Sequence, residues 1–123
     1  MADCDINIAR AYDDTGNLSG ALILVDGIWP RGVSKKDLAA DDWIKEVAPS
    51  DNLRKWFDHD PDKWEEFRKR YLKELEKNGD AVERCLDWCR EGKVTLLYGA
   101  KDREHNQAVV LRDHLCKRLE QEE

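Results

Sequence analysis

The chain has 123 residues, which is near the usual size of one domain and long enough to bury a hydrophobic core without metals or disulfides. Its residues are 41% hydrophobic and 39% charged, a composition too apolar for a disordered chain. The net charge of −6 disfavours non-specific nucleic-acid binding, and no apolar run approaches the roughly 18 residues that a membrane span needs.

The N-terminal part of the chain predicts two strands joined by a turn. Residues 6–12 alternate loosely between apolar and polar side chains, which predicts a strand. Residues 13–20 are dense in turn formers, so we expect a hairpin-like connection. Residues 21–25 form a short, continuous apolar run that ends at Asp26, and such a run is typical of a strand buried on both faces.

The next segment predicts two helices. Ser34 fits an N-cap, and we expect a helix over 35–46 with Leu38 and Trp43 facing inward. Ser50 can cap a second, shorter helix, in which apolar side chains again recur at helical spacing.

The C-terminal half predicts three helices and a further buried strand. The helices are expected at 61–77, 80–91 and about 104–119, and the strand at 94–98. Helical crossovers are how parallel strands are joined. The fold class predicted is therefore α/β: a small three-layer sandwich with a short, mainly parallel sheet covered by helices. No repeat or linker divides residues 1–123, so we expect a single domain.

The cysteines indicate a reducing compartment. They lie at positions 4, 85, 89 and 116, with no Cys-x-x-Cys pair, and we expect reduced thiols. Cys85 and Cys89 would share a helix face and could hold a metal, but burial as small apolar side chains is the favoured interpretation. The N-terminus lacks the regions of a signal peptide, so we expect a cytoplasmic protein.

A candidate site follows from the parallel strands. Their C-terminal ends share one sheet edge, where α/β folds usually bind ligands, so the loops after residues 25 and 98 should meet there. In the first loop, Trp29-Pro30-Arg31-Gly32 predicts a rigid elbow that can aim Arg31 at a carboxylate or phosphate. The alternative is that Arg31 pairs with Asp26 or caps a helix, and that Trp29 belongs to the core.

Histidines supply the candidates for proton transfer. In the second loop, Asp102 precedes His105 by three residues and could orient its imidazole, although a helix cap explains the same spacing. His59 could act as a base or a metal ligand, although an Asx turn explains its acidic neighbours equally well.

Four motifs in order resemble one bacterial family. They are Asp26 to Gly32, Ala48-Pro49-Ser50, Leu53 to Asp60, and Thr95 to Asp102 followed by His105-Asn106. Together they are similar to the YeaO-like branch of the domain of unknown function 488 family. The resemblance implies a small α/β fold and brings no established reaction. The family usually has Arg where this chain has Gly27, which removes an anion-binding group that Arg54 or Lys101 could replace.

These observations favour a protein that binds an anionic small molecule or nucleotide-like ligand at the sheet edge, with possible hydrolase or transferase activity and no cofactor identified. Non-catalytic regulatory or stress-associated interaction modules and metal-binding proteins are the alternatives. The candidate catalytic residues are His59, His105, Asp26 and Asp102. The candidate ligand-binding residues are Trp29, Arg31, Arg54, Lys101, Asn106 and Tyr98.

Overall fold

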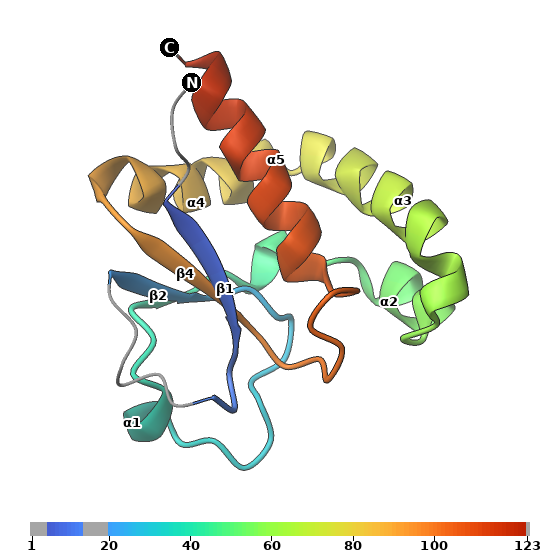
Figure 1. Cartoon of the computed structure of the whole chain (residues 1–123), viewed down its shortest axis with the longest axis horizontal. Coiled ribbons are helices and arrows are strands. Elements are labelled where there is room, and N and C mark those ends of the chain that lie inside the picture. Colours follow the sequence, from blue (N-terminus) through green and yellow to red (C-terminus); the bar gives the residue numbers. More distant parts are fainter. Residues whose placement is uncertain (1–4, 14–19, 123) are drawn as a thin grey trace.

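The computed structural model describes residues 5–13 and 20–122. At the centre of this part lies a four-stranded parallel sheet with the order β1-β4-β2-β3 (Figure 1). The strands are β1 (Ile6–Arg10), β2 (Ala21–Leu24), β3 (Asp42–Trp43) and β4 (Val94–Tyr98). The helices are α1 (Lys35–Leu38), α2 (Asp51–Phe57), α3 (Trp64–Lys77), α4 (Gly79–Glu91) and α5 (Gln107–Gln121), with the 3₁₀ helices η2 (Lys45–Val47) and η3 (Pro61–Lys63).

The prediction of a hairpin between the first two strands is wrong. Both β1 and β2 pair in parallel with β4, which lies between them: Leu96 faces Ile8 on one side and Ile23 on the other. All five residues of β4 are buried, so this strand needs a hydrogen-bonded neighbour at each edge. Most of the turn predicted at 13–20 lies outside the described residues.

The helix predicted over 35–46 is also wrong beyond its first turn. Ser34 does cap α1 by accepting a hydrogen bond from the Asp37 backbone N–H, but the helix ends at Ala39, which has a φ of 49°. The chain then forms β3, which pairs with the edge of β2. Backbone groups of β2 that would otherwise lack partners favour this short strand over a continued helix.

Side chains of β3 and α4 hold this sheet edge together. The Asp42 carboxylate accepts hydrogen bonds from Arg84 Nε at 2.9 Å and from Trp88 Nε1 at 3.0 Å. Beside it, the Asp41 backbone N–H donates to the Leu22 carbonyl at 2.7 Å, and the Asp41 side chain accepts from the Leu22 N–H.

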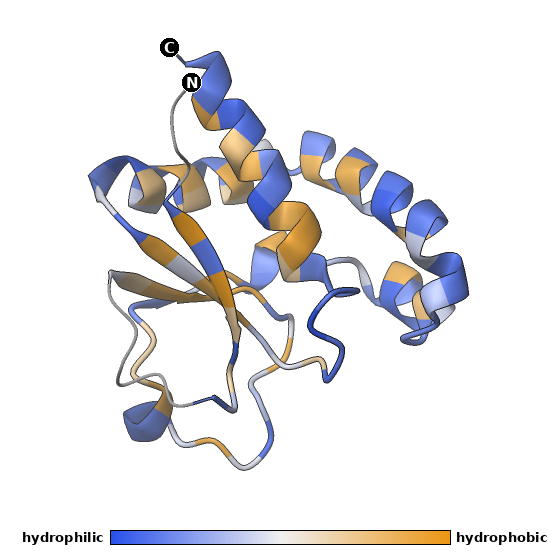
Figure 2. Ribbon diagram, viewed as in Figure 1, coloured by the Kyte–Doolittle hydropathy of each residue, from blue (hydrophilic) through white to orange (hydrophobic). Residues whose placement is uncertain are grey.

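Alternate residues of β2 face opposite sides of the sheet, as predicted for a strand buried on both faces. Ile23 belongs to the larger core, which lies between the sheet and helices α2 to α5. Leu22 and Leu24 face a smaller core closed by Leu38 of α1 and by the loop that carries Trp29. Figure 2 shows the hydrophobic residues on the strands and in stripes along the helices. The predicted α/β class with a parallel sheet is confirmed.

The remaining helices lie close to the predicted positions. Ser50 caps α2 by accepting from the Leu53 N–H, as predicted, and Glu74 of α3 binds the Ser50 N–H and hydroxyl at 2.8 and 2.6 Å. The buried Tyr71 hydroxyl donates to the Val47 carbonyl at 2.7 Å. These contacts fasten the segment between β3 and α2 onto α3.

Two cysteines are free thiols of the core, as expected. Burial raises the pKa of Cys85 to about 12 and that of Cys89 to about 11, which keeps both thiols protonated. Cys116 is disulfide-bonded, so the expectation of reduced thiols is wrong for this residue. Among the described residues, no helix is long and apolar enough to cross a membrane.

Candidate functional site

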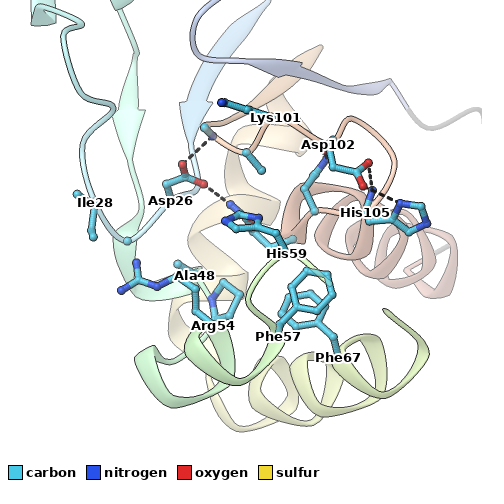
Figure 3. Close-up of a pocket in the computed structure, with 16 residues that line it drawn as sticks. Asp26, Ile28, Ala48, Arg54, Phe57, His59, Phe67, Lys101, Asp102 and His105 are labelled. Atoms are coloured by element: carbon cyan, nitrogen blue, oxygen red, sulfur yellow. Dashed lines mark hydrogen bonds and ion pairs between the residues drawn. The ribbon is translucent and has the colours of Figure 1, made fainter. Parts of the chain in front are cut away.

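The loops after β2 and β4 meet at the C-terminal edge of the sheet. The Asp26 carboxylate accepts a hydrogen bond from the Gly99 backbone N–H at 2.7 Å, and its other oxygen accepts from the Gln107 side-chain amide (Figure 3). The end of β2, the end of β4 and the start of α5 therefore converge on one carboxylate.

Gly99 permits this convergence. A Cβ atom at position 99 would lie 2.8 Å from an Asp26 carboxylate oxygen, closer than real Cβ contacts allow. A larger residue at position 99 would therefore displace the Asp26 carboxylate from its present position.

A cavity of about 660 Å³ opens beside Asp26. This volume lies within the range of small-molecule sites. Its walls come from the loops after β2 and β4, the segment before α2, and helices α2, α3 and α5 (Figure 3). The lining residues are Asp26, Gly27, Ile28, Ala48, Pro49, Arg54, Phe57, His59, Phe67, Gly99, Ala100, Lys101, Asp102, His105, Asn106 and Gln107.

Burial raises the pKa of Asp26 from 3.8 to about 6. The hydrogen bonds from Gly99 and Gln107 oppose this rise, as do the charges of Arg54 and His59, but desolvation of the carboxylate outweighs them. Asp26 is thus an ionised acceptor at neutral pH that takes up a proton in mildly acidic solution.

The cavity has an apolar side. The rings of Phe57 and Phe67 stack with their centroids 4.3 Å apart. Ile28, which is 61% exposed, borders the cavity on the side opposite these rings (Figure 3). Phe57 and Phe67 are 5% and 2% exposed, so an apolar part of a ligand would contact only a small area of these rings.

Two exposed cations, Arg54 and Lys101, flank Asp26 on either side in Figure 3. Arg54 pairs with the exposed Asp51 at 3.1 Å. Exposed ion pairs of this kind are weak, so the guanidinium stays available to a ligand.

His59 lines the cavity but has no hydrogen-bonded carboxylate among the described residues. The chain leaves α2 through Asp58 and His59, whose φ angles are 47° and 55°. The Asx turn lies at the next residue, where Asp60 accepts from the Asp62 N–H at 3.0 Å. The left-handed backbone turns the exposed His59 toward the cavity rather than toward a partner that would orient it.

The Asp102–His105 pair combines both interpretations of its spacing. Asp102 accepts from His105 Nδ1 at 2.9 Å, and it also caps the turn by accepting from the backbone N–H groups of Glu104 and His105. These backbone hydrogen bonds are the main reason that its pKa is lowered. The other side of the His105 ring contacts Trp64 edge to face at 5.3 Å.

Two predicted site residues have structural roles at the end of β4 and the start of α5. Asn106 lines the cavity, but it is buried and caps α5, accepting from the Val109 N–H and donating to the Asp102 carbonyl. Tyr98 is 1% exposed in the larger core and does not border the cavity. The sequence interpretation missed Gln107, whose only signal is its place directly after the cap.

The Trp-Pro-Arg-Gly elbow lies outside the cavity lining. Trp29 donates from Nε1 to the Val33 carbonyl at 2.6 Å and packs edge to face on Trp43 in the smaller core. Arg31 is exposed, and the Asp26 oxygens are bonded to other residues. Neither aiming of Arg31 into the cavity nor its pairing with Asp26 is seen.

Within residues 5–13 and 20–122, no three His, Cys, Asp or Glu side chains come together to hold a metal. The geometry of this part gives the metal-binding alternative no support.

Comparison with known proteins places the chain in a family. Residues 5–123 match the family model described as the inactive DUF488-N3 subclade. The chain is 42% identical over 111 residues to the uncharacterized protein YeaO of Escherichia coli K12, covering 90% of this chain and 96% of YeaO. It is 41% identical over 78 residues to the uncharacterized proteins Mb3100c of Mycobacterium bovis and Rv3073c of Mycobacterium tuberculosis, covering 63% of this chain and 66% of each. No solved structure matches. The chain belongs to the inactive DUF488-N3 subclade and is a YeaO-like member of the DUF488 family.

Proposed function

We propose that this protein reversibly binds a small, partly apolar anion, such as a nucleotide, in the cavity beside Asp26 and does not convert it chemically. The observation that carries the proposal is the combination of features in one cavity of about 660 Å³. The stacked rings of Phe57 and Phe67 supply an apolar surface, and Arg54 and Lys101 supply exposed positive charge. Cavities of this size with a few convergent polar groups are typical small-molecule sites.

The side chains around the cavity favour binding over turnover. Its lining, within the described residues, includes no Ser, Thr, Cys or Tyr that could serve as a nucleophile. Among the described residues, His59 has no orienting carboxylate. His105 has one in Asp102, but that carboxylate also accepts two backbone N–H groups and caps the turn. The description of the family as inactive agrees with this interpretation.

A thermal-shift panel of nucleoside monophosphates and inorganic phosphate tests the proposal. A ligand that binds only the folded state raises the melting temperature. We expect Arg54→Ala to weaken binding of the compounds that stabilise the parent by about tenfold, since a hydrogen bond to a charged group contributes about 1.5 kcal/mol or more. Arg31→Ala is the matched control, an exposed arginine outside the cavity, and it should bind like the parent.

The proposal would be abandoned if no compound shifts the parent, or if Arg54→Ala and Arg31→Ala bind equally well. Chromatography of the same mixtures checks for turnover. Conversion of a bound compound that disappears in Asp26→Asn would instead establish acid–base catalysis by this carboxylate, whose pKa of about 6 suits such a role.

Gly27→Arg provides a gain-of-binding test at the same cavity. Gly27 lines the cavity, and a Cβ there would make only an ordinary contact of 3.7 Å with Ala48. An arginine can therefore be accommodated without backbone strain. It also restores the residue that is usual at this position in the family. We expect anion affinity to rise by roughly fivefold at low salt, with the gain decreasing as salt is added. Gly27→Gln, similar in length but uncharged, is the control; an equal gain in both variants would exclude a charge effect.

A further inference from the structure

Asp26 is a partly buried acceptor in the cavity, and the proposed binding of an anion leaves its role unassigned. Its two oxygens each accept one hydrogen bond from the protein, from Gly99 and from Gln107. A carboxylate has about four acceptor positions, so each oxygen keeps capacity for one more donor. Because Asp26 lines the cavity, a ligand that enters the cavity and displaces water can supply those donors.

The surroundings restrict which donors fit. Arg54 and Lys101 flank the cavity, so an ammonium or other cationic ligand would face like charges. Neutral N–H groups meet no such repulsion. The apolar part of the lining, which includes Phe57, Phe67 and the exposed Ile28, favours a ligand with an apolar ring.

We infer that the ligand is a planar nitrogen heterocycle that presents adjacent neutral N–H donors to Asp26 and carries an anionic group toward Arg54 or Lys101. The inference rests on the proposed binding function and specifies its ligand. Among common nucleotides, the guanine base has this edge, because its ring N–H and exocyclic amine lie side by side. Adenine lacks the ring N–H, and hypoxanthine lacks the amine.

At neutral pH Asp26 is suited to this role. With a pKa of about 6 it is mostly ionised at pH 7.5 and offers only acceptors, whereas protonation at lower pH would turn one oxygen into a donor. Its hydrogen bonds to Gly99 and Gln107 hold the carboxylate in place before a ligand arrives.

The test is titration calorimetry at pH 7.5 with guanosine monophosphate, inosine monophosphate and inorganic phosphate. The two nucleotides differ by the exocyclic amine, so their affinity ratio measures the second donor. We expect the parent to bind guanosine monophosphate at least about tenfold more tightly than inosine monophosphate, because losing one partner of a buried charged acceptor is costly. In Asp26→Asn the ratio should fall to about one: the asparagine oxygen can accept from Gly99, Gln107 can turn its amide oxygen toward the new NH2 group, and that NH2 group presents a donor to the ligand.

Each other outcome overturns the inference. Equal or reversed affinities for the two nucleotides in the parent, with binding still weakened by Arg54→Ala, would reject the donor-bearing heterocycle and leave the anion site standing. Persistence of the tenfold ratio in Asp26→Asn would remove Asp26 from recognition. If the parent binds neither nucleotide nor phosphate, the inference and the proposed function fail together. If Asp26→Asn does not fold, a ratio near one in the parent still rejects the inference.

Discussion

Ionisation of Asp26 is expected to lower folding stability as pH rises from about 4 to 6, and replacing Asp26 with asparagine should remove this contribution. In the folded protein burial raises the pKa of Asp26 from 3.8 to about 6, so the folded state binds more protons than the unfolded state in this window. Ionisation of Asp26 therefore lowers the free energy of unfolding as pH increases through the window. The cost amounts to about 3 kcal/mol and persists at neutral pH.

The measurement is urea unfolding of the parent and Asp26→Asn at a series of pH values from 4 to 8. The stability of the variant relative to the parent should increase from pH 4 to 6 and then level off. Asp102→Asn is the control: the pKa of Asp102 is lowered, so it titrates below most of this window, and the stability difference between this variant and the parent should stay nearly constant from about pH 5 to 8. A stability difference between Asp26→Asn and the parent that stays constant over the window would contradict the assigned environment.

Gly20→Ala is expected to destabilise the fold by about 3 kcal/mol or more. Gly20 precedes β2 with a φ of 83°, a region that side chains rarely adopt. An added Cβ would lie 2.4 Å from the Lys93 carbonyl oxygen, which also accepts the Ala21 N–H of β2. Backbone strain of roughly 1–2 kcal/mol therefore adds to a clash that displaces the start of the β2–β4 ladder.

Gly79→Ala is the matched comparison for this variant. Gly79 begins α4, and an added Cβ would meet nothing within 4 Å. Alanine favours helix by about 1 kcal/mol over glycine in helix interiors, so this change should be neutral or slightly stabilising. Thermal and urea unfolding of both variants provide the comparison. Equal stability of the two would rule out the close approach at Gly20.

Local signals in the sequence predicted most of the fold. The boundaries of β4 are as predicted because a buried apolar strand ends sharply at Gly99. Ser34, Ser50 and the gap between α3 and α4 were also located correctly, since caps and turns depend on neighbouring residues. The failures are non-local. The two-residue strand β3 exists because β2 offers an edge, and β4 separates β1 from β2 through pairing across some 70 residues or more.

The sequence predicted the position of the candidate site at the sheet edge, but not all of the residues that line the cavity there. Parallel strands implied that Asp26 would meet the loop after β4, and the cavity there includes six residues of the candidate set other than Asp26. They are Arg54, His59, Lys101, Asp102, His105 and Asn106. Trp29 and Arg31 lie elsewhere because an indole that packs in the smaller core determines the direction of the elbow. Gln107 was not predicted, because a side chain that helps to hold a carboxylate in place produces no periodicity or motif in the sequence.

The two hydrogen bonds that hold Asp26 have a kinetic consequence. Because Gly99 and Gln107 position the carboxylate in the free protein, a ligand has little ordering of this group to accomplish on arrival. Ligands that differ only in the donors they offer should then associate at similar rates. The selectivity would then arise from their residence times, which depend on how many hydrogen bonds to Asp26 must break for the ligand to leave.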